Sequence, residues 1–189
     1  MLAMAKGIAE ARELLSKRRV GHEQAPSKRT IESIRRLFGR ELSPQEVVQR
    51  ILDDVRSDGD EALQKYTKLI EGIHLQRLEI PKVELRRAWD ALPQELAGAF
   101  ELAAERVREF NKMSLPKSWI DSNHGLGEMI TPIERVGIYI PGGTASYPST
   151  VLMNVIPAKI AGVDEVIICS PSSDGNLPES SILAAAYLA

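Results

Sequence analysis

The chain has 189 residues, 43% of them apolar and 26% charged, which is the composition of a globular protein with a sizeable core. Its 24 basic and 26 acidic residues give a formal net charge of -2, so no overall positive field favours a nucleic-acid partner. No stretch approaches the roughly 18 apolar residues of a membrane span, and the N-terminus lacks the pattern of a secretory signal, so we expect a cytoplasmic protein without a membrane partner.

Residues 1 to about 112 follow a helical pattern almost throughout. The clearest start signal is Ser43-Pro-Gln-Glu46, a capping box with proline at the first helical position. The apolar residues that follow share one helix face: Val47, Val48, Ile51, Leu52 and Val55. Asp58-Gly59-Asp60 ends this helix, and a second one follows from Glu61 to about Leu69.

The segment from 76 to 112 predicts one short strand and two more helices. Polar and apolar residues alternate over Gln76–Ile80, which allows a strand before Pro81 opens a helix. Pro93 interrupts the helical pattern, and a long apolar stripe follows: Leu96, Phe100, Ala103, Val107 and Phe110. Aromatic residues at this spacing indicate a packed core and not a cofactor site.

The organisation changes near residue 130. Residues 113–123 have the composition of a loop, and two short strands are expected at Glu128–Pro132 and Val136–Ile140. We therefore expect an α/β fold in which a mainly helical N-terminal region, residues 1–130, precedes the start of a Rossmann-like domain, residues 131–189.

The stretch from Arg135 to Cys169 predicts a β-α-β unit with parallel strands. The first strand breaks into Pro141-Gly-Gly143, a helix follows from about Pro148, and a second apolar run closes at Ser170-Pro171. Pro157 is expected to kink or divide the helix, because it removes a backbone hydrogen bond. The single cysteine, Cys169, excludes an intrachain disulfide and, at the end of an apolar strand, is expected to be a small buried side chain.

The last nine residues, 181–189, have the pattern of an apolar helix without a stop signal. Two parallel strands cannot bury both of their faces, since parallel sheets are normally larger and covered on both sides. We therefore expect the β-α-β domain to be incomplete and the protein to continue beyond Ala189.

The candidate ligand site lies where the first parallel strand ends. At the carboxyl end of such a strand, free backbone N–H groups bind anionic ligands, and the glycines after Pro141 would let a cofactor approach the backbone. Tyr139 adds a flat ring suited to a nucleotide. The alternatives are a simple tight turn and a core aromatic residue.

No reaction centre is evident in the sequence. The histidines, His22, His74 and His124, are far apart and lack the spacing of metal ligands. There is no serine or cysteine beside a base, and no pair of carboxylates indicates acid–base catalysis. The residues alone therefore indicate a ligand-binding junction without catalytic groups or a metal site.

The run from Val136 to Gly162 closely resembles the histidinol dehydrogenase family, and Ile51–Tyr66 resembles its first pair of helices. The resemblance implies a homodimeric, zinc-containing enzyme with a fold distantly similar to aldehyde dehydrogenases. Such an enzyme uses NAD to oxidise L-histidinol through histidinal to L-histidine, the last steps of histidine biosynthesis.

The resemblance also implies roles for particular residues. Tyr139 and Pro141 match positions that contact NAD in the family, whereas the catalytic residues and zinc ligands are expected downstream of Ala189, so none is assigned in this chain. Many members have Phe-Asp-Gly where this sequence has Ile70-Glu-Gly72. Ile70 therefore stands where the family often has an aromatic residue beside the cofactor, or is simply a core residue.

Two alternatives stay open at the level of the sequence. One is a related NAD-dependent dehydrogenase that oxidises another alcohol or aldehyde on the same scaffold. The other is a helical interaction module without catalytic activity, in which the β-α-β segment is only structural.

Overall fold

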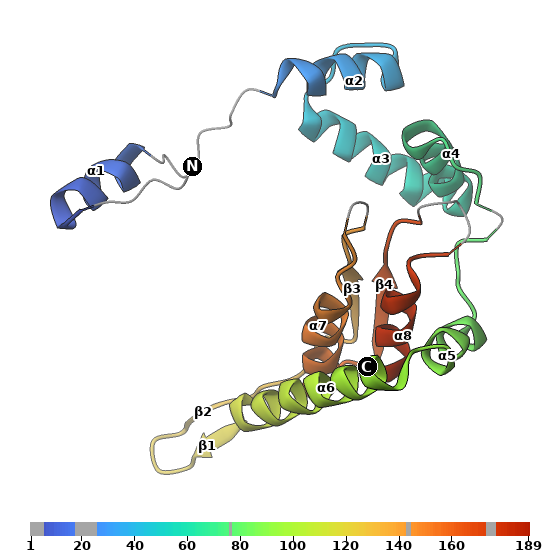
Figure 1. Cartoon of the computed structure of the whole chain (residues 1–189). Helices are drawn as coiled ribbons and strands as arrows, with labels where there is room; N and C mark the ends of the chain where they lie inside the picture. Colours follow the sequence, from blue (N-terminus) through green and yellow to red (C-terminus); the bar gives the residue numbers. More distant parts are fainter. Residues whose placement is uncertain (1–5, 18–25, 76, 143–144, 173–176) are drawn as a thin grey trace. The chain divides into compact units, whose positions relative to one another are not determined.

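The computed structural model describes residues 6–17, 26–75, 77–142, 145–172 and 177–189 (Figure 1). Over these residues the fold is mixed α/β and mostly helical, as the sequence predicts. The chain divides into two compact units, Met1–Ile70 and Glu71–Ala189. The domain boundary at residue 130, which marks the change to β-α-β organisation, stays a prediction.

The first unit is built from helices. They are α1 (Ile8–Lys17), α2 (Lys28–Phe38), α3 (Pro44–Asp58) and α4 (Asp60–Glu71). The predicted capping box begins α3: the Glu46 N–H donates to Ser43 Oγ at 3.2 Å, and the Ser43 N–H donates to Glu46 Oε2 at 2.7 Å. Gly59, with a positive φ of 57°, separates α3 from α4.

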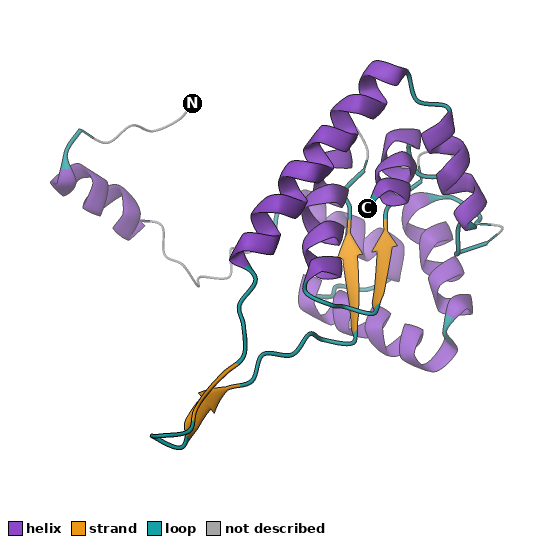
Figure 2. Ribbon diagram, turned by 90° about the horizontal axis from the view of Figure 1, so that it is seen from below, coloured by secondary structure: helices purple, strands orange, loops and turns teal. Residues whose placement is uncertain are grey.

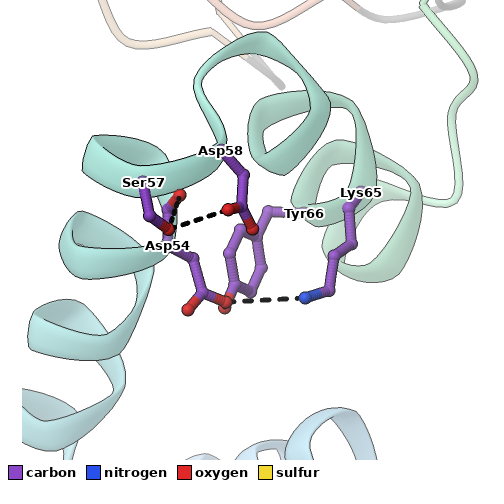
Figure 3. Close-up of polar contacts among 5 residues, drawn as sticks. All are labelled: Asp54, Ser57, Asp58, Lys65 and Tyr66. Carbon is purple, nitrogen blue, oxygen red and sulfur yellow. Dashed lines mark hydrogen bonds and ion pairs between the residues drawn. The ribbon is translucent and has the colours of Figure 1, made fainter.

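A polar contact joins α3 to α4 within this unit (Figure 3). The Tyr66 hydroxyl donates to Asp54 Oδ2 at 2.5 Å, and Lys65 Nζ lies 3.5 Å from the same oxygen. This hydrogen bond lowers the pKa of Asp54, while burial raises the pKa of Tyr66. The Tyr66 ring also lies 6.1 Å from the ring of Phe38, so α2 shares this small core.

The second unit holds the main core. Its helices are α5 (Lys82–Asp90), α6 (Gln94–Ser114), α7 (Pro148–Ile160) and α8 (Ser180–Leu188). Figure 1 shows α6, α7 and α8 beside one another. Their facing sides and the end of the first parallel strand form the apolar cluster: Phe100, Ala104, Ile138, Ile140, Val151, Leu152, Val155, Ile156, Ile182, Ala184 and Ala185.

The parallel β-α-β unit is confirmed. Strand β3 (Arg135–Tyr139) pairs in parallel with β4 (Glu165–Cys169), and α7 forms the crossover between them. Side chains alternate between the two faces of this pair. Ile138 and Ile140 belong to the core, whereas Tyr139 and its register partner Cys169 are exposed on the opposite face.

The prediction that Cys169 is buried is therefore wrong. An apolar strand buries both faces only where both are covered, and the face that carries Cys169 also leaves Ile167 41% exposed. Of the two outcomes predicted at Pro157, division of the helix is wrong, since α7 continues through it from Pro148 to Ile160, whereas a kink stays a prediction.

A short antiparallel hairpin precedes the parallel pair. It consists of β1 (Trp119–Asp121) and β2 (Leu126–Glu128), and Figure 2 shows it extending away from the helices of its unit. The sequence pattern predicted a loop where β1 lies and a strand at 128–132 in place of β2, because strands of three residues are too short to produce clear alternation. Residues 77–80 form no strand, and Gln76 lies outside the described residues.

Candidate functional site

Tyr139 ends β3 on the open face of the parallel pair. Its side chain is 69% exposed, and its register partner on β4 is Cys169. Because the preceding residue Ile138 is buried among the helices, strand alternation fixes the tyrosine ring toward solvent. The alternative interpretation of Tyr139 as a core aromatic residue is thus wrong for this structure.

The backbone after Tyr139 bends tightly against the end of β4. The Ile140 N–H donates to the Cys169 carbonyl at 2.8 Å, which extends the parallel ladder by one bond. Pro141 is half-buried and Gly142 is exposed. A Cβ at Gly142 would lie 2.7 Å from Pro171 Cγ, so the bend requires glycine for contact with the neighbouring loop.

The loop that follows this bend is attached to the start of α8. Ser146 Oγ donates to Glu179 Oε2 at 2.7 Å and lies 2.8 Å from Ser181 Oγ. The same carboxylate oxygen accepts the Ser181 N–H at 2.9 Å, so Glu179 caps α8. Burial raises the pKa of Glu179, but the hydrogen bonds from Ser181 and Ser146 outweigh burial and leave it below 4.5.

One buried hydroxyl follows β4 directly. Ser170 Oγ makes no hydrogen bond to any residue that the structure describes. An unpaired buried hydroxyl costs free energy unless water or a ligand satisfies it. The carboxyl ends of β3 and β4 therefore combine an exposed aromatic ring, a glycine bend and an unsatisfied polar atom.

Sequence reasoning missed Ser146, Ser170 and Glu179. Ser146 and Glu179 are 33 residues apart, and only the fold brings them together. The one local signal was Glu179 itself, an acceptor placed just before the apolar run of α8, which is the usual position of a helix cap.

Comparison with known proteins identifies the family. The model of the histidinol dehydrogenase family matches residues 39–189. The chain belongs to this family.

Individual histidinol dehydrogenases show how much of the family's length is present. The chain is 46% identical over 148 residues to that of Acinetobacter baylyi, covering 75% of this chain and 34% of the relative. It is 39% identical over 186 residues to that of Dehalococcoides mccartyi, covering 97% of this chain and 42% of the relative.

A solved structure agrees with the fold. The crystal structure of histidinol dehydrogenase from Elizabethkingia anophelis matches with a TM-score of 0.74 and 28% identity, over 97% of this chain and 39% of that one. The chain thus spans about a third to two fifths of the length of the histidinol dehydrogenases it matches.

Ile70 and the three histidines lie apart from the β3 bend in sequence. Ile70 ends the first compact unit with half of its surface exposed, so it is not a core residue. His74 is exposed, and His22 lies outside the described residues. His124 Nδ1 lies 2.7 Å from Asp121 Oδ2 in the hairpin turn, a contact at three-residue spacing that sequence reasoning overlooked.

The described part of the chain holds no group of three or more His, Cys, Asp or Glu side chains that could bind a metal ion. These residues do not fit a zinc ion, and zinc chemistry is assigned to none of them. Nor does any helix in the described ranges have the length and hydrophobicity to cross a membrane.

Proposed function

We propose that the chain is the N-terminal part of a cytoplasmic, homodimeric histidinol dehydrogenase that oxidises L-histidinol through histidinal to L-histidine. Family membership over residues 39–189 supports this reaction. The chain spans about two fifths or less of its relatives, so the catalytic residues and zinc ligands are assigned to the part of the family that it does not span. Its own contribution is one edge of an NAD cleft.

The observation that carries the proposal is the exposure of Tyr139 at the carboxyl end of a parallel strand. Ligands of open α/β sheets bind at this edge. Bound NAD would supply the hydride acceptor, and the residues present fit such a ligand. The Tyr139 ring offers a flat apolar surface, Pro141 follows two residues later, and the Ser170 hydroxyl, which has no partner among the described residues, comes directly after the neighbouring strand.

Isothermal titration calorimetry of the chain with NAD tests this assignment. Replacing Tyr139 with Ala is expected to weaken NAD binding about tenfold, since stacking on an aromatic ring contributes roughly 1–3 kcal/mol per base. Tyr139→Phe should retain most of the affinity because the ring is kept. Phe110→Ala is the matched control, since Phe110 is 66% exposed and lies outside the site. Equal NAD affinity in Tyr139→Ala and the parent chain would refute the assignment.

A chimera tests the reaction itself. The present chain replaces the matching N-terminal part of the Dehalococcoides mccartyi histidinol dehydrogenase, with which it aligns over 97% of its length. We expect NADH formation that depends on L-histidinol and that falls in the Tyr139→Ala chimera. Activity on other alcohols but not on L-histidinol would instead support a related dehydrogenase.

A further inference from the structure

Two loops meet at the carboxyl edge of the β3–β4 pair. One runs from β3 into α7 and the other from β4 into α8, and Figure 2 shows that both strands point to the same end of the pair. Gly142 of the first loop lies against the second, since a Cβ on it would be 2.7 Å from Pro171 Cγ. Ser146 of the first loop donates a hydrogen bond to Glu179 of the second, at 2.7 Å. The two loops are therefore joined at two places.

The carboxylate of Glu179 receives three donors on one oxygen. The Ser146 hydroxyl donates to Oε2, the Ser181 N–H donates at 2.9 Å, and the Ser181 hydroxyl donates to the same atom. Burial raises the pKa of Glu179, but the hydrogen bonds from Ser181 and Ser146 lower it by more, so the group is ionised at neutral pH. Hydrogen bonds to a charged acceptor are about twice as strong as neutral ones. The cap of α8 needs only the Ser181 N–H, so the Ser146 bond is a separate contact between the loops.

Ser146 attaches the segment that precedes α7, residues 145–147. All three side chains are exposed. Tyr147, the N-cap residue of α7, makes no side-chain hydrogen bond to the helix. Within the part of the chain that the structure describes, the side-chain hydrogen bonds of this segment are those of Ser146 with Glu179 and Ser181. Removal of the Ser146 hydroxyl should therefore loosen the segment without opening the core.

We propose that Ser146 and Glu179 are positioning residues for the cofactor edge. Their hydrogen bond holds the loop after β3 against the loop after β4, so that the bend at Pro141 and Gly142 keeps one conformation next to Tyr139. A ligand that binds to a loop already held in place avoids the entropic cost of ordering it during association. The inference rests on the NAD site of the proposed function, and in it neither Ser146 nor Glu179 contacts NAD.

Calorimetric titration with NAD tests the positioning role. Ser146→Ala is expected to weaken NAD binding about fivefold, since a hydrogen bond to a charged group is lost, whereas Ser146→Thr keeps a hydroxyl and should retain the parent affinity. Ser114→Ala is the matched control, because the Ser114 hydroxyl donates within α6, to the Phe110 carbonyl at 3.1 Å. Thermal unfolding of Ser146→Ala should stay close to that of the parent chain, since the cap of α8 remains. A loss of affinity without loss of stability is not expected from a purely structural contact.

A double-mutant cycle tests whether the two residues act through each other. Glu179→Ala should weaken NAD binding at least as much as Ser146→Ala. The double variant should bind no more weakly than Glu179→Ala alone, because the same hydrogen bond is lost in both. Glu179→Gln keeps an oxygen acceptor, and its NAD affinity should lie between those of the parent chain and Glu179→Ala. Additive losses in the double variant would overturn the pairing of Ser146 with Glu179.

Hydrogen exchange measures the order of the loop without NAD. The backbone amides of residues 145–147 should exchange about fivefold faster in Ser146→Ala than in the parent chain, and at the parent rate in Ser114→Ala. Unchanged exchange in Ser146→Ala overturns the positioning role. So does unchanged NAD affinity in Ser146→Ala while Tyr139→Ala still weakens binding, and that result leaves the proposed function intact. A parent chain that binds no NAD overturns the cofactor edge and the positioning role with it.

Discussion

The two faces of the β3–β4 pair are made of similar residues but have opposite environments. One face carries Ile138 and Ile140 into the core beneath α7 and α8, and Ile140 is completely buried. The other face leaves Tyr139, Ile167 and Cys169 exposed. An apolar strand therefore does not by itself indicate a core. Its burial depends on which elements cover it, and the uncovered face is the one on which the cofactor contact is proposed.

Truncation of one isoleucine on each face tests this difference most strongly. Ile140→Ala is expected to lower the free energy of unfolding by about 2–5 kcal/mol, because it removes fully buried methylenes and leaves a cavity. Ile167→Ala, at a side chain that is 41% exposed, should cost less than about 1 kcal/mol. Urea denaturation measures both. Equal losses would show that the second face is covered in solution.

Two glycines offer a second comparison between a crowded and an open position. Gly142→Ala should destabilise the protein by about 1–3 kcal/mol, since its Cβ would lie 2.7 Å from Pro171 Cγ. Gly137→Ala on β3 is the control, because a Cβ there meets nothing within 4 Å. The difference between the melting temperatures of the Gly142→Ala and Gly137→Ala variants measures how closely Gly142 packs on Pro171. Similar values would mean that the two loops do not approach each other.

The smallest expected effect concerns the cap of α8, the helix that helps cover the buried face. The pKa of Glu179 is lowered in the folded state, so its ionised form stabilises the fold above pH 4.5, and this contribution is lost as the pH falls below that value. Glu179→Gln should reduce stability at pH 7 by about 1 kcal/mol. In thermal unfolding, the difference in stability between parent and variant should narrow as the pH falls through the lowered pKa of Glu179. A constant gap would contradict a role for the charge.

The sequence predicted those parts of the fold whose signals are local. The capping box of α3 needs only Ser43 and Glu46, three residues apart, and the β-α-β unit follows from two apolar runs on either side of a helix. The strands of the hairpin were misplaced because three residues cannot establish a period. The prediction that Cys169 is buried was wrong because the tertiary structure, and not the strand pattern, decides which face of a strand other elements cover.

For the candidate site, the sequence predicted where the strand and the bend lie along the chain but not which side chains contact one another. The position of Tyr139 at the end of a parallel strand followed from the pattern of β3, and the structure places it there. That Gly142 packs on Pro171 and that Ser146 binds Glu179 depends on loops that are 29 and 33 residues apart. The cofactor contacts of Tyr139 and Pro141 stay predictions until NAD binding is measured.

The exposed Cys169 gives the protein a natural reporter. It is the sole thiol of the sequence, and it lies opposite Tyr139 in the strand register. Any nucleotide or protein segment that covers this face must slow the alkylation of that thiol by a maleimide. The rate at which a maleimide alkylates Cys169, followed by mass spectrometry, therefore measures whether this face is covered. The measurement needs no mutation and no attached dye.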